Sequence, residues 1–327
     1  MRARHFLVRF LTPAFLGDAG QAGQWRTPPF KHLLREWWRV AWAAEHDPAG
    51  WPRMRAEEGK LLGHAWLNTA QGEDTVRSRR SLVRLRLDPW AAGTMKNMPR
   101  TAPAGAGQRA VPSHVYLGYG PVKSATELKM VHPIDAQASA RLSLAFPDDE
   151  SGARLLDPAL SLIHAFGAVG GRSRNGWGSL CLEREDGAAP PLAIERYGRP
   201  WRECLDVEWA HAIGKDQTGL LMWITPPRRE WQTVIEDLAR VRKEVNALAS
   251  SSGKREVLNQ PVKGKGERVP SNLRFKVVQG DAGQLQGLVF HMPCLPPPAQ
   301  HISRQEIEDV WQAVHDHLDG ALQRCVS

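Results

Sequence analysis

The sequence has few cysteines and no long apolar run, and these absences exclude several classes of protein. Its 327 residues include four scattered cysteines, none in a CxxC pair or with a histidine at zinc-finger spacing: Cys181, Cys204, Cys294 and Cys325. We therefore expect free thiols in a reducing compartment and no structural zinc. No segment approaches the roughly 20 apolar residues of a membrane span. Residues 1–10 alternate apolar and polar side chains, unlike a signal peptide, so we expect a cytoplasmic protein without a membrane partner.

Nucleotide-binding and two-metal motifs are also missing. The glycine-rich segment 167–178 follows a predicted helix and precedes a predicted strand, which is the reverse of a dinucleotide-binding fold. No GK[ST] sequence closes it as in a Walker loop. The acidic run Asp148, Asp149 and Glu150 follows a strand at a predicted turn, where we expect solvated carboxylates. We therefore predict no metal and no cofactor.

A strong basic balance is present instead. The chain has 43 lysines and arginines against 35 acidic residues, a net charge of +8 and a pI near 9.6. Such a surplus favours a polyanionic partner, because lysine and arginine neutralise phosphates and release counterions. The alternative is a basic surface that binds nothing.

Hydrophobic periodicity predicts an α+β fold in two similar halves. The first half has strands and helices in the order strand 4–11, helix 28–44, strands 81–87 and 141–146, helix 157–166 and strand 177–183. The second half has strand 219–224, helix 228–248, strands 272–279 and 286–292, and a helix that begins at Ser303. This is the order of tandem ferredoxin-like (RRM-like) domains. We expect domains at 1–190 and 203–327, and a linker at 184–202 that is rich in glycine and proline.

The two halves also share a short repeat. Thr27-Pro28-Pro29 and Thr225-Pro226-Pro227 each follow a strand, and each is predicted to open a tryptophan-bearing amphipathic helix. Between the predicted strands 81–87 and 141–146, residues 89–112 are rich in glycine, proline and alanine. We expect this excursion to be poorly ordered unless it touches a partner.

The first helix combines an apolar face with a cationic flank. Lys31, Arg35 and Arg39 follow one another at i+4 steps, which predicts a stripe that contacts phosphates. A solvated basic face beside a core helix is the alternative. Trp38 and Trp42 lie at the border of the two faces. They and Trp177 are candidates for stacking on bases or riboses, with core packing as the alternative.

The segment 167–178 joins flexible main chain to positive charge. Arg172 and Arg174 lie two residues apart among glycines whose N–H groups can approach a phosphate backbone. Asn175 is predicted to take a left-handed turn position. An ordinary glycine-rich turn is the alternative.

Several segments resemble one protein family. Ala168-Val169-Gly170-Gly171-Arg172-Ser173-Arg174-Asn175-Gly176-Trp177-Gly178-Ser179 resembles the C-terminal glycine-rich loop of the RAMP superfamily of CRISPR-associated proteins. The stretches at 11–17, 25–39, 116–120 and 268–275 resemble one member, the first subunit of the type III-B (Cmr) effector complex. The chain departs from that subunit at Pro29-Phe30 and His32, where the family usually has small residues.

The resemblance implies a non-catalytic subunit that grips crRNA, target RNA or both near the crRNA 3′ end, with other RAMP subunits as partners. The RNA-binding residues expected from it and from the patterns above are Arg26, Lys31, Arg35, Trp38, Arg39, Gly170, Gly171, Arg172, Ser173, Arg174, Asn175, Trp177 and Arg268.

Two alternatives stay open. Some RAMP relatives process crRNA with a histidine base, and His32 lies beside Lys31 and Arg35, which could stabilise a pentacoordinate phosphate. A lone helical histidine is more often structural or exposed, so we expect no catalytic residue. The other alternative is a purely structural subunit whose basic face meets acidic neighbours.

Overall fold

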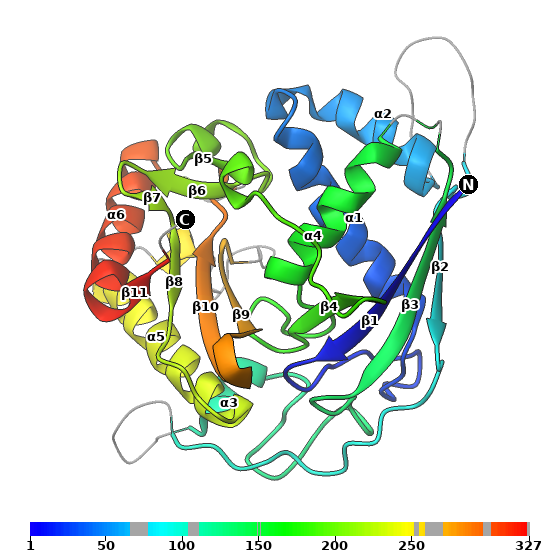
Figure 1. Cartoon of the computed structure of the whole chain (residues 1–327). Helices are drawn as coiled ribbons and strands as arrows, with labels where there is room; N and C mark the ends of the chain where they lie inside the picture. Colours follow the sequence, from blue (N-terminus) through cyan, green and yellow to red (C-terminus); the bar gives the residue numbers. More distant parts are fainter. Residues whose placement is uncertain are drawn as a thin grey trace.

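The first half of the chain is an antiparallel sheet covered on one face by helices. The computed structural model describes residues 1–65, 78–103, 111–148, 150, 152–251, 255–258, 271–296 and 302–325. Strands β1 (Arg2–Phe10), β2 (Arg84–Asp88), β3 (Ser139–Phe146) and β4 (Leu180–Arg184) pair in the order β2-β3-β1-β4. Helices α1 (Thr27–Ala43) and α4 (Leu156–Phe166) cover one face (Figure 1), because β1 alternates and buries Phe6, Val8 and Phe10 on that side.

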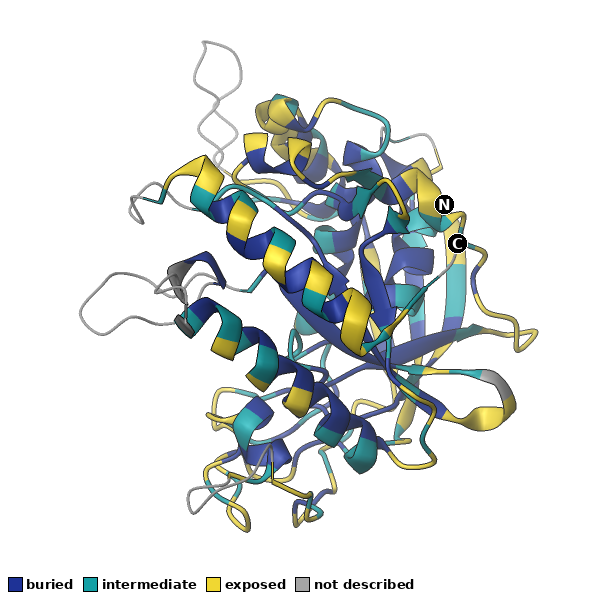
Figure 2. Ribbon diagram, turned by 90° about the vertical axis from the view of Figure 1, so that its left-hand side faces the viewer, coloured by how far each residue is buried: buried dark blue, intermediate teal, exposed yellow. Residues whose placement is uncertain are grey.

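The second half repeats this plan with a second sheet. Strands β8 (Met222–Ile224), β9 (Leu273–Gln279), β10 (Leu285–His291) and β11 (Gln323–Arg324) pair in the order β11-β8-β10-β9. Helices α5 (Trp231–Ser251) and α6 (Arg304–Ala321) cover its outer face (Figure 1). Figure 2, which views the molecule from these helices, shows their exposed outer surfaces in front of buried strands. The predicted helix start at Ser303 is confirmed, and Ser303 and Glu306 form a capping box there.

The two halves pack into four layers, in the order sheet, helices, sheet, helices (Figure 1). The second sheet is therefore covered on both faces, and most residues of β9 and β10 are buried, including the charged Arg274 and Lys276. On β10, Leu288 and Phe290 face the first half, and Phe290 lies 5.0 Å from Phe166 of α4 between ring centroids. Val289 faces the opposite way, into the core with α5 and α6.

Smaller elements complete the described chain. They are α2 (Trp51–Leu62), α3 (Ser113–Gly118), the three-stranded sheet of β5 (Gly198–Pro200), β6 (Ile213–Asp216) and β7 (Gly219–Leu220), and the 3-10 turns η1 (Pro48–Gly50), η2 (Ala153–Leu155), η3 (Ile194–Tyr197), η4 (Glu203–Asp206), η5 (Arg255–Leu258) and η6 (Asp281–Gly283). The predicted α+β class is confirmed. The division into two domains with a linker at 184–202 stays a prediction.

Three local expectations were wrong. Helix α5 begins at Trp231 and not at Arg228, because Arg228 pairs with Leu285 through two backbone hydrogen bonds that keep this segment extended. The strand expected at 219–224 is divided between β7 and β8. In the excursion 89–112, residues 91–93 pair with residues 23–25, and Met95 and Met98 are buried, so this part is packed within the chain.

Candidate nucleic-acid interface

The glycine-rich segment lies where the two halves meet. Its ends are joined by a hydrogen bond of 3.0 Å from the Val169 N–H to the Gly178 carbonyl. On one side, the Gly171 N–H donates to the Phe15 carbonyl at 2.9 Å. On the other side, the Arg174 carbonyl accepts from the N–H of Phe275 in β9, also at 2.9 Å. The segment is therefore held by main chain from both halves.

Two glycines of this segment are required by its geometry. Gly178 has φ of +62°, and a Cβ there would lie 1.9 Å from the Val169 carbonyl oxygen. Gly170 has φ of +96°, and its Cβ would lie 2.7 Å from the Phe15 carbonyl oxygen. A side chain at either position would collide with backbone that holds the loop.

Among the non-glycine residues between these glycines, the left-handed one is Arg172, with φ of +60°. The prediction that Asn175 takes that conformation was wrong. The Asn175 side chain instead makes hydrogen bonds inside the protein. The Asn175 amide donates to the Leu117 carbonyl at 3.0 Å, and its oxygen accepts from Arg242 at 3.3 Å. Asn175 therefore ties the loop to α3 and α5.

Two arginines from different halves meet one glutamate of α1 beside the loop. Arg274 Nη1 of β9 lies 2.6 Å from Glu36 Oε1, and Arg174 Nη2 lies 3.7 Å from the same oxygen. Burial alone would raise the pKa of Glu36, but the charges of Arg274 and Arg174 outweigh it and lower that pKa. Burial, followed by repulsion from Arg274, lowers the pKa of Arg174 to about 10. The cluster keeps a net positive charge, and the Arg174 side chain is 35% exposed.

The predicted cationic stripe on α1 is partly neutralised by α2. Arg35 Nη1 lies 2.6 Å from Glu58 Oε1, and Arg39 Nε lies 2.7 Å from Glu58 Oε2. Arg35 also donates to the carbonyls of Leu62 and Gly63 at the end of α2. Arg35 therefore ties two helices together. Both arginines line a cavity of about 350 Å³ with Arg55 and Glu58, so positive charge still exceeds negative charge there.

The stacking role expected of Trp38, Trp42 and Trp177 was wrong, because all three side chains are fully buried. The Trp38 indole N–H donates to the Gly152 carbonyl at 2.9 Å, and the Trp42 indole N–H donates to Glu57 Oε2 at 2.9 Å. The core-packing alternative holds for each ring, so none offers a face to a base.

The other expected residues are more scattered. Arg26 donates to the Gly17 carbonyl at 2.7 Å, within the loop before α1. Lys31 is half-buried, and burial followed by repulsion from Arg35 lowers its pKa. His32 is exposed on α1. Gly170, Gly171, Arg172 and Ser173 are half-buried in the loop, and Arg268 lies outside the described residues.

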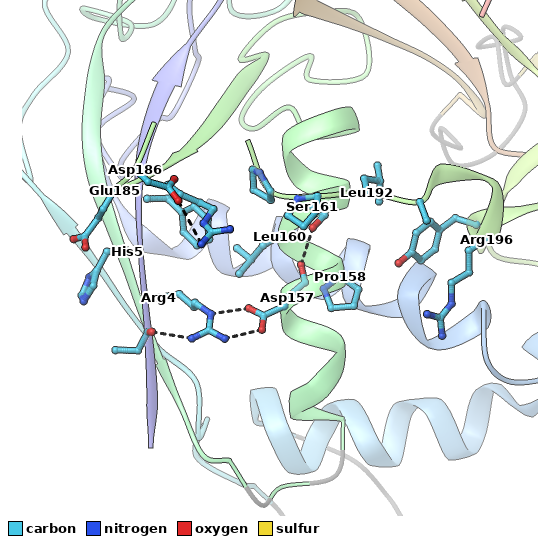
Figure 3. Close-up of a pocket in the computed structure, with 17 residues that line it drawn as sticks. Arg4, His5, Asp157, Pro158, Leu160, Ser161, Glu185, Asp186, Leu192 and Arg196 are labelled. Atoms are coloured by element: carbon cyan, nitrogen blue, oxygen red, sulfur yellow. Dashed lines mark hydrogen bonds and ion pairs between the residues drawn. The ribbon is translucent and has the colours of Figure 1, made fainter. Parts of the chain in front are cut away.

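A larger cavity, of about 730 Å³, lies between β1, β4, α4 and the segment 190–197 (Figure 3). Its charges balance. Arg4 makes two hydrogen bonds to Asp157, Arg184 faces Asp186 at 3.5 Å, and Arg196 is paired with Glu45. This cavity therefore offers no positive surplus for a polyanion.

Sequence patterns alone did not reveal the partners of the predicted arginines. Glu36 and Glu58 look like ordinary helix-surface residues in the sequence. Arg274 and Lys276 could have been recognised in the sequence, because they alternate with apolar residues in strand 272–279, which places both charges on one face of a core strand.

Among the described residues, no group of three or more His, Cys, Asp or Glu side chains could hold a metal ion. Within the same residues, no helix is long and apolar enough to cross a membrane.

The two sheets and the helices that cover them are the fold of an α+β protein. The chain shares its fold with the crystal structure of Cmr1 from Pyrococcus furiosus in its apo form, with a TM-score of 0.50, 15% sequence identity and 97% of each chain covered. The resemblance to the first subunit of the type III-B (Cmr) complex is therefore confirmed at the level of the fold.

Two further solved structures match less well. They are chains of type III-B Cmr-beta complexes bound to cognate target RNA, one of them also with AMPPnP and ssDNA. Their TM-scores are 0.47 and 0.44, with 10% and 11% identity, coverage of 97% and 95% of this chain and 99% of theirs. No protein-family model and no curated protein matches the sequence.

Proposed function

We propose that this chain is a non-catalytic RNA-binding subunit of a crRNA-guided, type III-B-like CRISPR interference complex in the cytoplasm. It would grip crRNA, target RNA or both near the crRNA 3′ end, beside other RAMP subunits. The observation that carries the proposal is the fold shared with Cmr1 along 97% of both chains. The net positive charge of +8 supports a polyanionic ligand.

We also propose that the two halves are tandem ferredoxin-like domains of the RAMP type. In the first half, β1, α1, β2, β3, α4 and β4 form a sheet in which the fourth strand lies beside the first, followed by the third and the second. In the second half, β8, α5, β9, β10, α6 and β11 follow the same plan. This shared order supports the assignment.

The RNA backbone would meet this subunit at the glycine-rich segment. Arg174 Nη1 donates to the Ser271 carbonyl at 3.2 Å, whereas the contact of its Nη2 with Glu36, at 3.7 Å, is longer than a hydrogen bond, so Nη2 is suited to a phosphate. Arg274, at 2.6 Å, would keep Glu36 neutralised if a phosphate took over Arg174. Ser173 adds a hydroxyl donor in the same half-buried stretch.

Replacement of Arg172 and Arg174 by alanine in the reconstituted complex tests this proposal. We expect weaker RNA binding. We also expect the slope of the logarithm of the binding constant against the logarithm of the salt concentration to fall by roughly 1.4, because two contacts with single-strand phosphates are lost. A matched control replaces Arg202 and Arg304, two exposed arginines that both pair with Glu308. Unchanged affinity and slope in the Arg172/Arg174 variant would refute the loop assignment. Lost assembly with unchanged RNA affinity would favour the structural alternative.

The non-catalytic part of the proposal has its own test. Labelled repeat RNA is incubated with the purified protein without metal, and we expect no specific cleavage. If specific cleavage occurs and is abolished by His32→Ala, the chain is a metal-independent endoribonuclease of the kind that the exposed His32 beside Lys31 permits.

A further inference from the structure

The open face of the first sheet carries a second concentration of positive charge, away from the glycine-rich segment. Helices α1 and α4 lie on the opposite face, and β2 forms the outer edge of the sheet (Figure 1). The burial of β2 alternates, so Arg84 and Arg86 are exposed on the open face while Leu85 and Leu87 face the helices. Arg79 and Arg80, just before the strand, are exposed as well. Four arginines therefore fall within eight residues.

Arg84 and Arg86 differ from Arg35, Arg39 and Arg174, because no acidic group in the described part of the chain forms an ion pair with them. Arg35 and Arg39 share Glu58, whereas neither Arg84 nor Arg86 has an ion pair or hydrogen bond to another described side chain. The next arginine across the sheet, Arg141 of β3, is paired with Glu185 at 2.6 Å.

The neighbours of these two arginines have short side chains. Strand register places Arg84 beside Ala145 and then Ala3, and places Arg86 beside Ser143 and then His5. The His5 ring is held down on the sheet by a contact of 2.9 Å between its Nδ1 and Ser143 Oγ. The guanidinium groups therefore border a low surface over which an extended chain can pass. Two positions along a strand separate them by roughly 7 Å.

We propose that Arg84 and Arg86 bind the phosphate backbone of single-stranded RNA, as a second contact surface distinct from the glycine-rich segment. The inference rests on the proposed function, because the ligand is the RNA that the assembled complex holds. Each guanidinium presents a planar fork of donors that matches two phosphate oxygens.

Charge and composition favour RNA over an acidic protein at this surface. A protein interface needs a desolvated centre of aromatic or large apolar side chains. On the outward positions of β1, β2 and β3, the exposed large apolar side chain is Leu7, at 42% exposure. Contacts with a phosphate backbone need no such centre, since counterion release supplies the driving force. The edge position of β2 also suits arginines that block strand pairing, and the experiment separates that role from RNA binding.

The test compares RNA affinity across a salt series for three variants in the reconstituted complex. For Arg84→Ala/Arg86→Ala we expect roughly five- to tenfold weaker RNA binding. The slope of the logarithm of the binding constant against the logarithm of the salt concentration should be reduced by about 1.4. Arg84→Lys/Arg86→Lys, which keeps both charges, should retain most of the slope. The matched control, Arg2→Ala/Arg141→Ala, removes two exposed arginines that are paired with Asp148 and Glu185, and should leave affinity nearly unchanged.

The outcomes separate this inference from the proposed function. If the Arg172/Arg174 variant weakens RNA binding but the Arg84/Arg86 variant does not, the second surface is refuted while the proposed function stands. If neither variant weakens binding, both fail. A loss of complex assembly or solubility with unchanged RNA affinity would assign Arg84 and Arg86 to a protein contact or to edge protection, and would overturn the inference.

Discussion

Arg274 Nη1 lies 2.6 Å from Glu36 Oε1, and this ion pair joins strand β9 of the second half to helix α1 of the first. The alternation of β9 explains why it is possible. Leu273, Phe275 and Val277 face α5 and α6, so Arg274 and Lys276 face the first half. The same pair stands beside Arg174 of the glycine-rich segment. The contact that holds the halves together is therefore also the support for the candidate phosphate ligand.

Glu36→Gln is expected to destabilise the protein by about 3 kcal/mol, because it leaves Arg274, which is 7% exposed, without its counter-charge. Chemical denaturation measures the change. The control is Glu127→Gln, which breaks the surface pair with Lys123 and should cost less than about 1 kcal/mol. Equal effects of the two substitutions would show that the Arg274 pair is not a structural joint.

Gly178→Ala should destabilise the protein by roughly 3 kcal/mol or more, since the new methyl group collides with the Val169 carbonyl as well as straining the backbone. Gly187→Ala is the matched control. Gly187 also has a positive φ, of +79°, but nothing lies within 4 Å of a Cβ there. Its cost should stay near 1–2 kcal/mol. Thermal unfolding of both variants gives the comparison, and similar costs would mean that the loop is not tightly held.

Trp38→Ala should lower stability by roughly 3–5 kcal/mol, as expected for a large buried side chain. Its effect on RNA binding should vanish once binding is expressed per folded molecule. The substitution separates core packing from base stacking. Weaker RNA binding by a fully folded Trp38 variant would restore the stacking role.

The contribution of Lys276 to stability should rise with pH between about 7 and 9. Burial lowers the pKa of Lys276 from 10.5 to about 7, where its ammonium donates to the carbonyls of Ile163 and His164 at the end of α4. In this window the Lys276 amine is protonated in the unfolded chain and largely neutral in the folded chain. Its contribution to the free energy of unfolding therefore rises by up to about 1.4 kcal/mol per pH unit. The cysteines act in the opposite direction from about pH 8 upward, because free thiols titrate near 8.5 while burial raises the pKa of Cys204 to about 12 and also raises the pKa of Cys181, Cys294 and Cys325.

The test of this slope is denaturation of the wild type and of Lys276→Met at several pH values from 7 to 8.5. The variant removes the titrating amine while keeping a long side chain in the same space, so the slope of its unfolding free energy against pH should lie below that of the wild type by up to about 1.4 kcal/mol per pH unit. A slope that survives the substitution would assign the pH dependence to another group.

Local patterns predicted the main elements of this fold well. Helix α1 was expected at 28–44 and spans Thr27–Ala43, and strand β1 was expected at 4–11 and spans Arg2–Phe10. Their periodicity is strong because each buries a single face. The strands β5, β6 and β11 were not predicted, because each is too short to show a clear hydrophobic period.

The site was less predictable, because its charges are paired over long sequence distances. Arg35 meets Glu58, 23 positions away, on a helix that the polar and mixed segment 47–80 did not reveal. The basic strand residues Arg84 and Arg86 were visible in the sequence, but their lack of acidic partners in the described chain became apparent only with the strand register. Which arginines are neutralised depends on tertiary packing and not on local composition.

Crosslinking of RNA to this chain in the native assembly tests the central claim most directly. We expect zero-length crosslinks from crRNA or target RNA to the peptide that contains Arg172, Ser173 and Arg174, and their loss in the Arg172→Ala/Arg174→Ala variant. Crosslinks confined to neighbouring subunits, with none on this chain in an assembled and RNA-loaded complex, would contradict it.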